Sequence, residues 1–146
     1  MLGVMSQEVG QVWGAIFGQS VRYAFWPVSD GDGTGSVQLA TGVSVWGAWT
    51  DIIALNAIAT EFWLCGLHTF TPNQIQVWQI QIGTAAGAAL LFPVTLDITA
   101  LTMNVNMTEL PYPIWIAPNA NIDGRAGGAG VTKTIEVQLL YAVAIW

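Results

Sequence analysis

The residues best suited to chemistry in this sequence are one cysteine and one histidine. Cys65 and His68 both fall in EFWLCGLHTFT, residues 61–71, whose aromatic and apolar content predicts a β-strand. A catalytic thiolate needs a base within hydrogen-bond distance. Because side chains alternate between the faces of a strand, a separation of three places the two residues on opposite faces. We therefore expect a small core residue at Cys65 and a polar surface or interface residue at His68, and no catalytic pair.

A candidate metal site begins in the glycine-rich stretch SDGDGTGS, residues 29–36. Asp30, Asp32 and Thr34 match the first oxygen ligands of a calcium-binding loop. Thr41 stands at the twelfth position, where such a loop requires a bidentate glutamate. We expect a solvated loop, with calcium binding as the open alternative. Zinc needs three or four His, Cys or carboxylate ligands, so with one His and one Cys we expect no cofactor.

Acid–base chemistry and carbohydrate binding each have one candidate pair. Asp51 and Glu61 flank a short loop and resemble a glycosidase pair only in being two carboxylates, so we expect solvated charges. Trp46 and Trp49 flank Gly47, where we favour burial in the core or a subunit interface, with a glycan platform as the alternative. Because no convergent set of titratable groups remains, the sequence predicts a protein that is not an enzyme.

The charge content limits the function class more strongly than any motif. Of the 146 residues, 8% are charged and 53% hydrophobic, whereas an average soluble domain carries about 25% charged residues. A surface with so few charges associates unless neighbouring protein covers it, so we expect a part of an assembly. The net charge of −6, with only Arg22, Arg125 and Lys133 as cations, argues against a nucleic-acid partner.

No segment of the sequence resembles a membrane span or a secretory signal. The apolar stretches are interrupted by Asp51, Asn56, Glu61 and Pro93, so none offers the roughly 20 apolar residues of a spanning helix. The first ten residues lack a positively charged region followed by an apolar run. We expect a soluble protein with no membrane partner.

The first 20 residues differ in period from the rest of the chain. An apolar stripe with helical spacing is formed by Val9, Val12, Trp13, Ile16 and Phe17. Three glycines, at positions 10, 14 and 18, weaken a helix by about 1 kcal/mol each, so the segment needs a surface to lie on. The sequence predicts an arm or short amphipathic helix over residues 1–20, docked either on its own domain or on a neighbouring subunit, and one β-sandwich domain over residues 21–146.

The pattern after residue 20 predicts strands separated by turns every 8–12 residues. We expect eight to nine short strands among the segments 21–28, 37–45, 46–54, 61–71, 73–82, 88–98, 101–108, 110–118, 122–126 and 131–146. Glycine and proline stand between them, and the helix-favouring Glu, Lys and Arg are scarce. The prediction is an all-β fold, a jelly-roll-like antiparallel β-sandwich of about eight strands.

Two strands carry further information. In residues 73–82 the apolar alternation changes phase at Val77–Trp78, which predicts a β-bulge there. The last strand alternates at first and is wholly apolar after Leu140, which predicts burial on both faces. Another subunit is the natural cover at a chain end, so we expect the interface residues Tyr141, Ile145 and Trp146 in addition to the N-terminal stripe.

Four stretches together resemble small virion proteins of tailed bacteriophages. They are GAWTDIIALNAIATEFWLCGL (residues 47–67), IQIGTAAGAALLFPVTL (80–96), LPYPIWIAPNANIDGRAGG (110–128) and KTIEVQLLYA (133–142). Some members of this group decorate the capsid or belong to the tail. The resemblance implies a β-sandwich structural protein of the virion.

The leading expectation is a capsid decoration or cement protein that stabilises the shell through apolar contacts. Its expected partners are itself, as a homotrimer, and the major capsid protein or other virion proteins. One alternative is a tail or fibre component that binds host glycan through Trp46 and Trp49. A second alternative is an eight-stranded outer-membrane β-barrel, which the chain length and the terminal aromatic residue permit.

Overall fold

The computed structural model describes residues 20–27, 35–42, 46–101, 105–128 and 133–145. These residues form nine strands: β1 (Ser20–Trp26), β2 (Val37–Ala40), β3 (Thr50–Ile53), β4 (Phe62–Phe70), β5 (Gln76–Thr84), β6 (Ala89–Ile98), β7 (Val105–Ile116), β8 (Ile122–Gly127) and β9 (Thr134–Ile145). Within these ranges no helix is long and apolar enough to cross a membrane.

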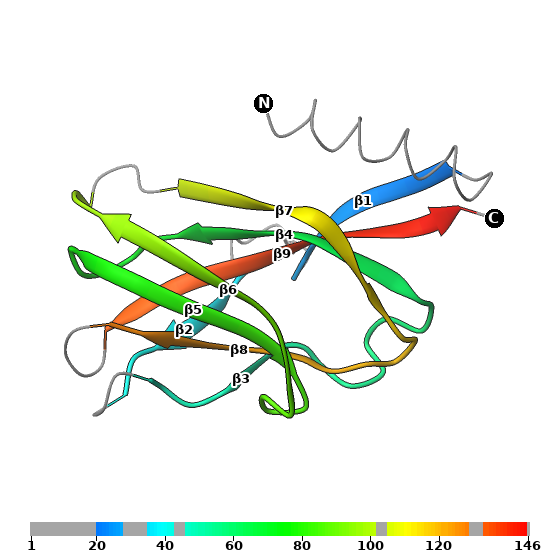
Figure 1. Ribbon diagram of the computed structural model, residues 1–146, viewed down its shortest axis with the longest axis horizontal. Helices are drawn as coiled ribbons and strands as arrows, with labels where there is room; N and C mark the ends of the chain where they lie inside the picture. The colour runs from blue at the N-terminus through cyan, green and yellow to red at the C-terminus, as the bar shows by residue number, and fades with distance from the viewer. Residues whose placement is uncertain (1–19, 28–34, 43–45, 102–104, 129–132, 146) are drawn as a thin grey trace.

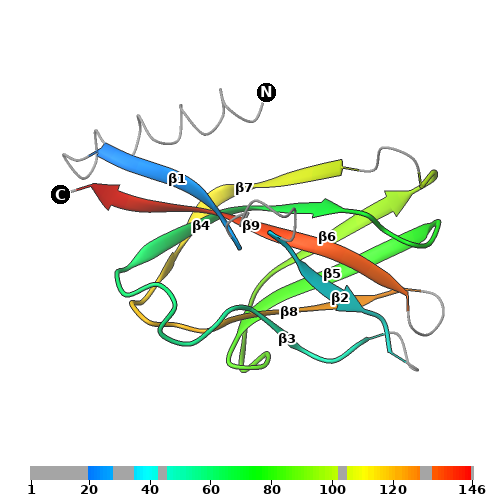
Figure 2. The ribbon, with the colours of Figure 1, turned by 180° about the vertical axis from the view of Figure 1, so that it is seen from behind.

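The strands form two antiparallel sheets that pack face to face (Figure 1). The first sheet has the order β1-β9-β4-β7, and β2 also pairs with β9, beyond the end of β1 (Figure 2). The second sheet has the order β3-β8-β5-β6. The pairs are nested, since β1 pairs with β9, β3 with β8, β4 with β7 and β5 with β6. This nesting over two open sheets is the jelly roll, and the predicted fold class is confirmed.

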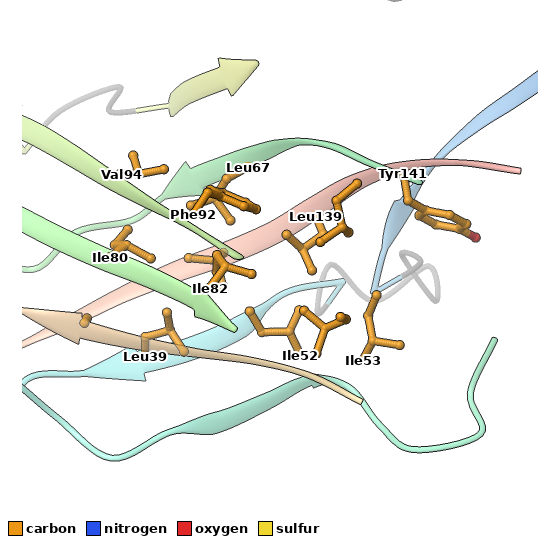
Figure 3. Packing of buried hydrophobic residues seen from close by; sticks show 14 of the residues in the cluster. Leu39, Ile52, Ile53, Leu67, Ile80, Ile82, Phe92, Val94, Leu139 and Tyr141 are labelled. Carbon is orange, nitrogen blue, oxygen red and sulfur yellow. The ribbon is translucent and has the colours of Figure 1, made fainter. Parts of the chain in front are cut away.

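The core lies between the two sheets and is built from alternate residues of their strands (Figure 3). Its fully buried aliphatic side chains are Leu39, Ile53, Leu64, Leu67, Ile80, Ile82, Ile122, Ile135, Val137 and Leu139. Trp78 and Phe62 are the largest side chains with no exposure. Each such side chain stabilises the fold by about 1.5–3 kcal/mol relative to an exposed position, so the core needs no disulfide.

Strand β7 joins two segments that the sequence predicts as separate strands, residues 101–108 and 110–118. It continues through Pro111 and Pro113 because it is the edge strand of the first sheet. The pairing with β4 also breaks there, so that the residues around these prolines oppose Cys65 alone. Proline lacks an N–H and is tolerated at an edge or a bulge, and β7 offers both.

The β-bulge predicted at Val77–Trp78 is wrong in position. The pairing of β5 with β6 is unbroken through Ile82, and the register shifts between Ile82 and Gly83. Val77 therefore points outward, half exposed, while Gln76 lies on the inner side with both side-chain amide atoms buried. The burial of β5 follows its pairing with β6 and not the local order of apolar and polar residues.

The chain passes from the first sheet to the second through a tight crossing between β2 and β3, so both strands are shorter than predicted. The Gly47 N–H donates to the Ala126 carbonyl at 2.9 Å. A Cβ at Gly47 would overlap the carbonyl oxygen of Ala40, and one at Gly42 would overlap that of Trp46. Glycine is required at both positions because backbone atoms fill the space of a side chain.

Candidate functional site

The outer face of the second sheet holds the one cluster in the described residues in which aromatic rings meet a cation. The Arg125 guanidinium carbon lies 4.7 Å from the ring centroids of both Trp46 and Trp49. Its Nε donates to the Gln81 side-chain oxygen at 2.7 Å, across the β5–β8 pair. Cation–π contacts contribute about 0.5–2 kcal/mol each. The sequence predicts the tryptophan pair but gives no sign that Arg125 joins it, since β8 is distant from both in the sequence.

The β5–β6 turn lies against the Trp49 ring. The sequence predicts a turn at residues 83–87, and the structure has one at residues 85–88, with Gly83 and Thr84 still in β5. A Cβ at Gly87 would overlap the Trp49 indole, and one at Gly83 would lie 3.3 Å from it. Gly87 also has a φ of 85°, in the left-handed region that favours glycine. Gly83 in β5 and Gly87 in the turn therefore leave the space in which the Trp49 ring lies.

Two carboxyl groups face each other beside this cluster. Asp51 on β3 is exposed, as expected of a solvated charge, and is paired with Asp123 on β8, a partner that the sequence did not indicate. Asp123 is 2% exposed, and its Oδ2 accepts the Ala86 N–H. The Asn121 amide donates to Asp51 Oδ1 at 3.1 Å. Burial and the hydrogen bond to Asp51 raise the pKa of Asp123, whereas hydrogen bonds from Asp123 and Asn121 lower the pKa of Asp51.

This carboxyl pair predicts a stability maximum in mildly acidic solution. Because its folded pKa is raised, Asp123 contributes stability that is present below its unfolded pKa and lost as pH rises through the folded value. Asp51 has a lowered pKa and contributes stability above its unfolded pKa that is lost as pH falls through the folded value. At pH values above the raised pKa of Asp123, we expect Asp123→Asn to raise the melting temperature by roughly 2–4 °C.

Thermal melts from about pH 3 to about pH 8 measure this effect. Asp97→Asn, at an exposed position on β6, serves as the control and is expected to leave the shape of the profile unchanged. An Asp123→Asn profile parallel to that of the unmodified chain contradicts the opposite pKa shifts of the two carboxyl groups.

The prediction that Cys65 and His68 lie on opposite faces is wrong. The register of β4 shifts between Leu64 and Gly66, and this extra residue changes the phase of the strand. Both residues therefore reach the outer face of the first sheet, where the His68 ring lies 5.8 Å from that of Phe25. His68 Nδ1 contacts the Gln138 side chain at 3.3 Å, and the Cys65 thiol lies 3.6 Å from the Trp63 carbonyl. Burial raises the pKa of Cys65 to about 12, the reverse of what a nucleophile needs.

Cys65 belongs to a second apolar cluster, on the side of the first sheet away from the core. This outer apolar face consists of Val21, Tyr23, Phe25, Trp63, Cys65, Leu140 and Ala142. It spans β1, β9 and β4. With the core on the other side, β9 is buried on both faces at residues 139–142, whereas Val143 and Ala144 are half-buried, so the predicted burial on both faces holds for part of the strand.

The expected interface residues divide between described and undescribed positions. Val9, Val12, Trp13, Ile16, Phe17 and Trp146 lie outside the described residues, as do Asp30 and Asp32. The backbone of Ile145 pairs with Ser20 at the end of β9. Tyr141 is in the core of its own chain, where its ring packs edge-on against those of Phe62 and Trp26. It faces the core because Leu139 and Tyr141 share one side of β9.

Large apolar side chains are exposed on β7, which the interface expectation did not include. Tyr112 is 80% exposed and Trp115 is 54% exposed. The Trp115 indole N–H donates to a Glu61 carboxylate oxygen at 2.8 Å, and its ring stays open to solvent. The prolines in this strand were the sequence signal for its exposure, since proline in a sheet is confined to edge strands and bulges.

No protein-family model matches the sequence, and no curated protein matches it. Two solved structures of infectious bursal disease virus are similar in fold. The Gx strain structure has a TM-score of 0.42 at 12% identity, and the Gt strain structure has a TM-score of 0.37 at 14% identity. Each match covers 85% of this chain, which spans about a third (32% and 33%) of the length of those chains.

Proposed function

We propose that this protein is a non-enzymatic structural protein of a tailed-phage virion, a capsid decoration or cement protein that acts as a homotrimer on the major capsid protein. One observation carries the proposal: a jelly roll with few charges leaves large apolar side chains exposed on an edge strand. Jelly rolls are common in viral capsid and lectin domains. The resemblance of four sequence stretches to small phage virion proteins supports the same role.

The proposed contacts between copies are made by Tyr112 and Trp115 on β7 and by Ile145 and Trp146 at the chain end. Exposed aromatic rings are typical anchors of protein interfaces, because they bury a large area at a low cost in side-chain entropy. A surface with few charges also loses little hydration when it is covered. Binding across subunit junctions of a shell would add buried apolar area without any chemical step.

The first test is the mass of the unmodified chain in detergent-free solution, by light scattering after size exclusion. We expect a closed oligomer, and we expect Tyr112→Glu with Trp115→Glu to weaken its association by about 30-fold or more, since two anchors are lost. Leu55→Glu, an equally large change at an exposed position between β3 and β4, serves as the control. A monomer at every concentration overturns the proposed assembly, and failure to locate the chain on virions overturns the proposed location.

A second candidate function rests on the cluster around Arg125. Two indole rings beside a guanidinium group suit an acidic sugar, whose ring stacks on tryptophan while its carboxylate pairs with arginine. A tail or fibre protein that binds host glycan would use this cluster. A glycan array separates the two functions: acidic glycans retained by the unmodified chain and lost by Arg125→Gln favour the second.

A further inference from the structure

The charge of Arg125 has no acidic partner in the described part of the chain. Its Nε donates to the side chain of Gln81, which is neutral, and no described carboxylate forms an ion pair with it. Asp123 lies two residues earlier on the same face of β8, but its Oδ2 accepts the N–H of Ala86 instead. Arg125 is half-buried, and a buried charge without a partner is costly. An anion from outside the chain is therefore the expected partner.

Neutral side chains hold the guanidinium group of Arg125 in place. The rings of Trp46 and Trp49 lie against it at 4.7 Å, and the hydrogen bond to Gln81 at 2.7 Å fixes its orientation. No described residue accepts a hydrogen bond from its two terminal nitrogens. A guanidinium group presents a planar pair of donors that matches the two oxygens of a carboxylate. Arg125 is therefore already positioned for a carboxylate before one binds.

The side chains beside Arg125 suit a sugar ring. Gln81 pairs with Arg125 across β5 and β8, and Gln79, two residues earlier on β5, faces the same side and is exposed. Thr95 on β6 lies directly opposite Gln79 and is also exposed. Two residues along a strand span about 7 Å, so a carboxylate on Arg125 brings the hydroxyls of the same sugar residue close to this pair. Amide and hydroxyl groups both donate and accept, as sugar hydroxyls do.

We propose that Arg125 binds an acidic saccharide through a carboxylate attached directly to the sugar ring, as in a uronic acid, and that Gln79 and Thr95 bind the ring hydroxyls. The proposal rests on the second candidate function and adds Gln81 as a positioning residue. Because Gln81 accepts the Nε–H without carrying a charge, it orients the guanidinium group and leaves the positive charge for the ligand. Gln81→Glu would keep this hydrogen bond but pair the charge from within the chain.

Isothermal titration calorimetry of the full chain with a galacturonic acid trisaccharide tests the proposal. We expect the unmodified chain to bind and Gln81→Glu to bind about tenfold more weakly or worse, while its melting temperature stays the same or rises with the new ion pair. Arg125→Lys keeps the charge but not the planar pair of donors, so we expect a loss of similar size. Asn73→Asp makes the same change from amide to acid at an exposed position beside β9, in the other sheet. It is the matched control and should bind like the unmodified chain.

Four other outcomes overturn the proposal. Unchanged affinity in Gln81→Glu and Arg125→Lys contradicts the role of the guanidinium group, while binding by the unmodified chain still supports the second candidate function. Equal binding of the corresponding galactose trisaccharide means that the carboxylate is not recognised. Tighter binding of a hexaglutamate peptide means that the site takes a protein partner. No binding of any of these probes by the unmodified chain overturns the second candidate function as well. If Gln81→Glu fails to fold, Arg125→Lys provides the second variant.

Discussion

Leu67→Ala is expected to lower the free energy of unfolding by about 2–5 kcal/mol. Leu67 has no exposed surface and lies on β4, in the core between the two sheets (Figure 3). The loss combines the transfer of the side chain with the cavity that its neighbours cannot close. Chemical denaturation monitored by tryptophan fluorescence measures it.

Leu55→Ala is the matched control, because it removes the same atoms from an exposed position. We expect a change within about 0.5 kcal/mol there. Similar losses at the two positions would mean that the core is not where β4, β5 and β9 place it, and would contradict the jelly-roll packing. A large loss at Leu67 alone supports it.

Gly47→Ala is expected to cost about 3 kcal/mol or more and to leave much of the chain insoluble. The added Cβ would overlap the carbonyl oxygen of Ala40, which is backbone and cannot rotate away. Relief requires the β2–β3 crossing to open, and this breaks the hydrogen bond from Gly47 to Ala126. The yield of soluble protein and its melting temperature measure the effect.

The neighbouring position provides the control for that substitution. Ala48→Ser also adds one heavy atom, but Ala48 is exposed. We expect its melting temperature to stay within roughly 2 °C of the unmodified chain. Normal folding of Gly47→Ala would show that the two sheets are not joined by this close crossing.

Alternation along single strands was a reliable guide only where the register was regular. The phase of β4 changes at Cys65 because four residues of β7 oppose one residue of β4, and nothing within residues 61–71 records that mismatch. On β5 the apolar Val77 faces outward while Gln76 faces inward, because the unbroken pairing with β6 holds both of them there. Bulges and register belong to strand pairs, so one strand's sequence does not contain them.

The sites formed across strands were equally invisible in the sequence. Arg125 meets Trp46 and Trp49, and Asp123 meets Asp51, because β8 lies between β3 and β5 in the second sheet. Each of these pairs is more than 70 residues apart along the chain. The sequence shows each of these residues, but the order of the strands decides which of them lie side by side.

The sequence by itself determined the all-β class, most strand positions, the presence of a turn between β5 and β6 and the burial of the middle of β9 on both faces. These features follow from composition, from alternation and from glycine and proline, which act over a few residues. Only the tertiary structure decided the nested strand order, the continuous β7, the outer apolar face and the clusters around Arg125 and Asp123. Those features depend on which distant strands pair and in which register, and that choice is made by burying the core of the whole chain.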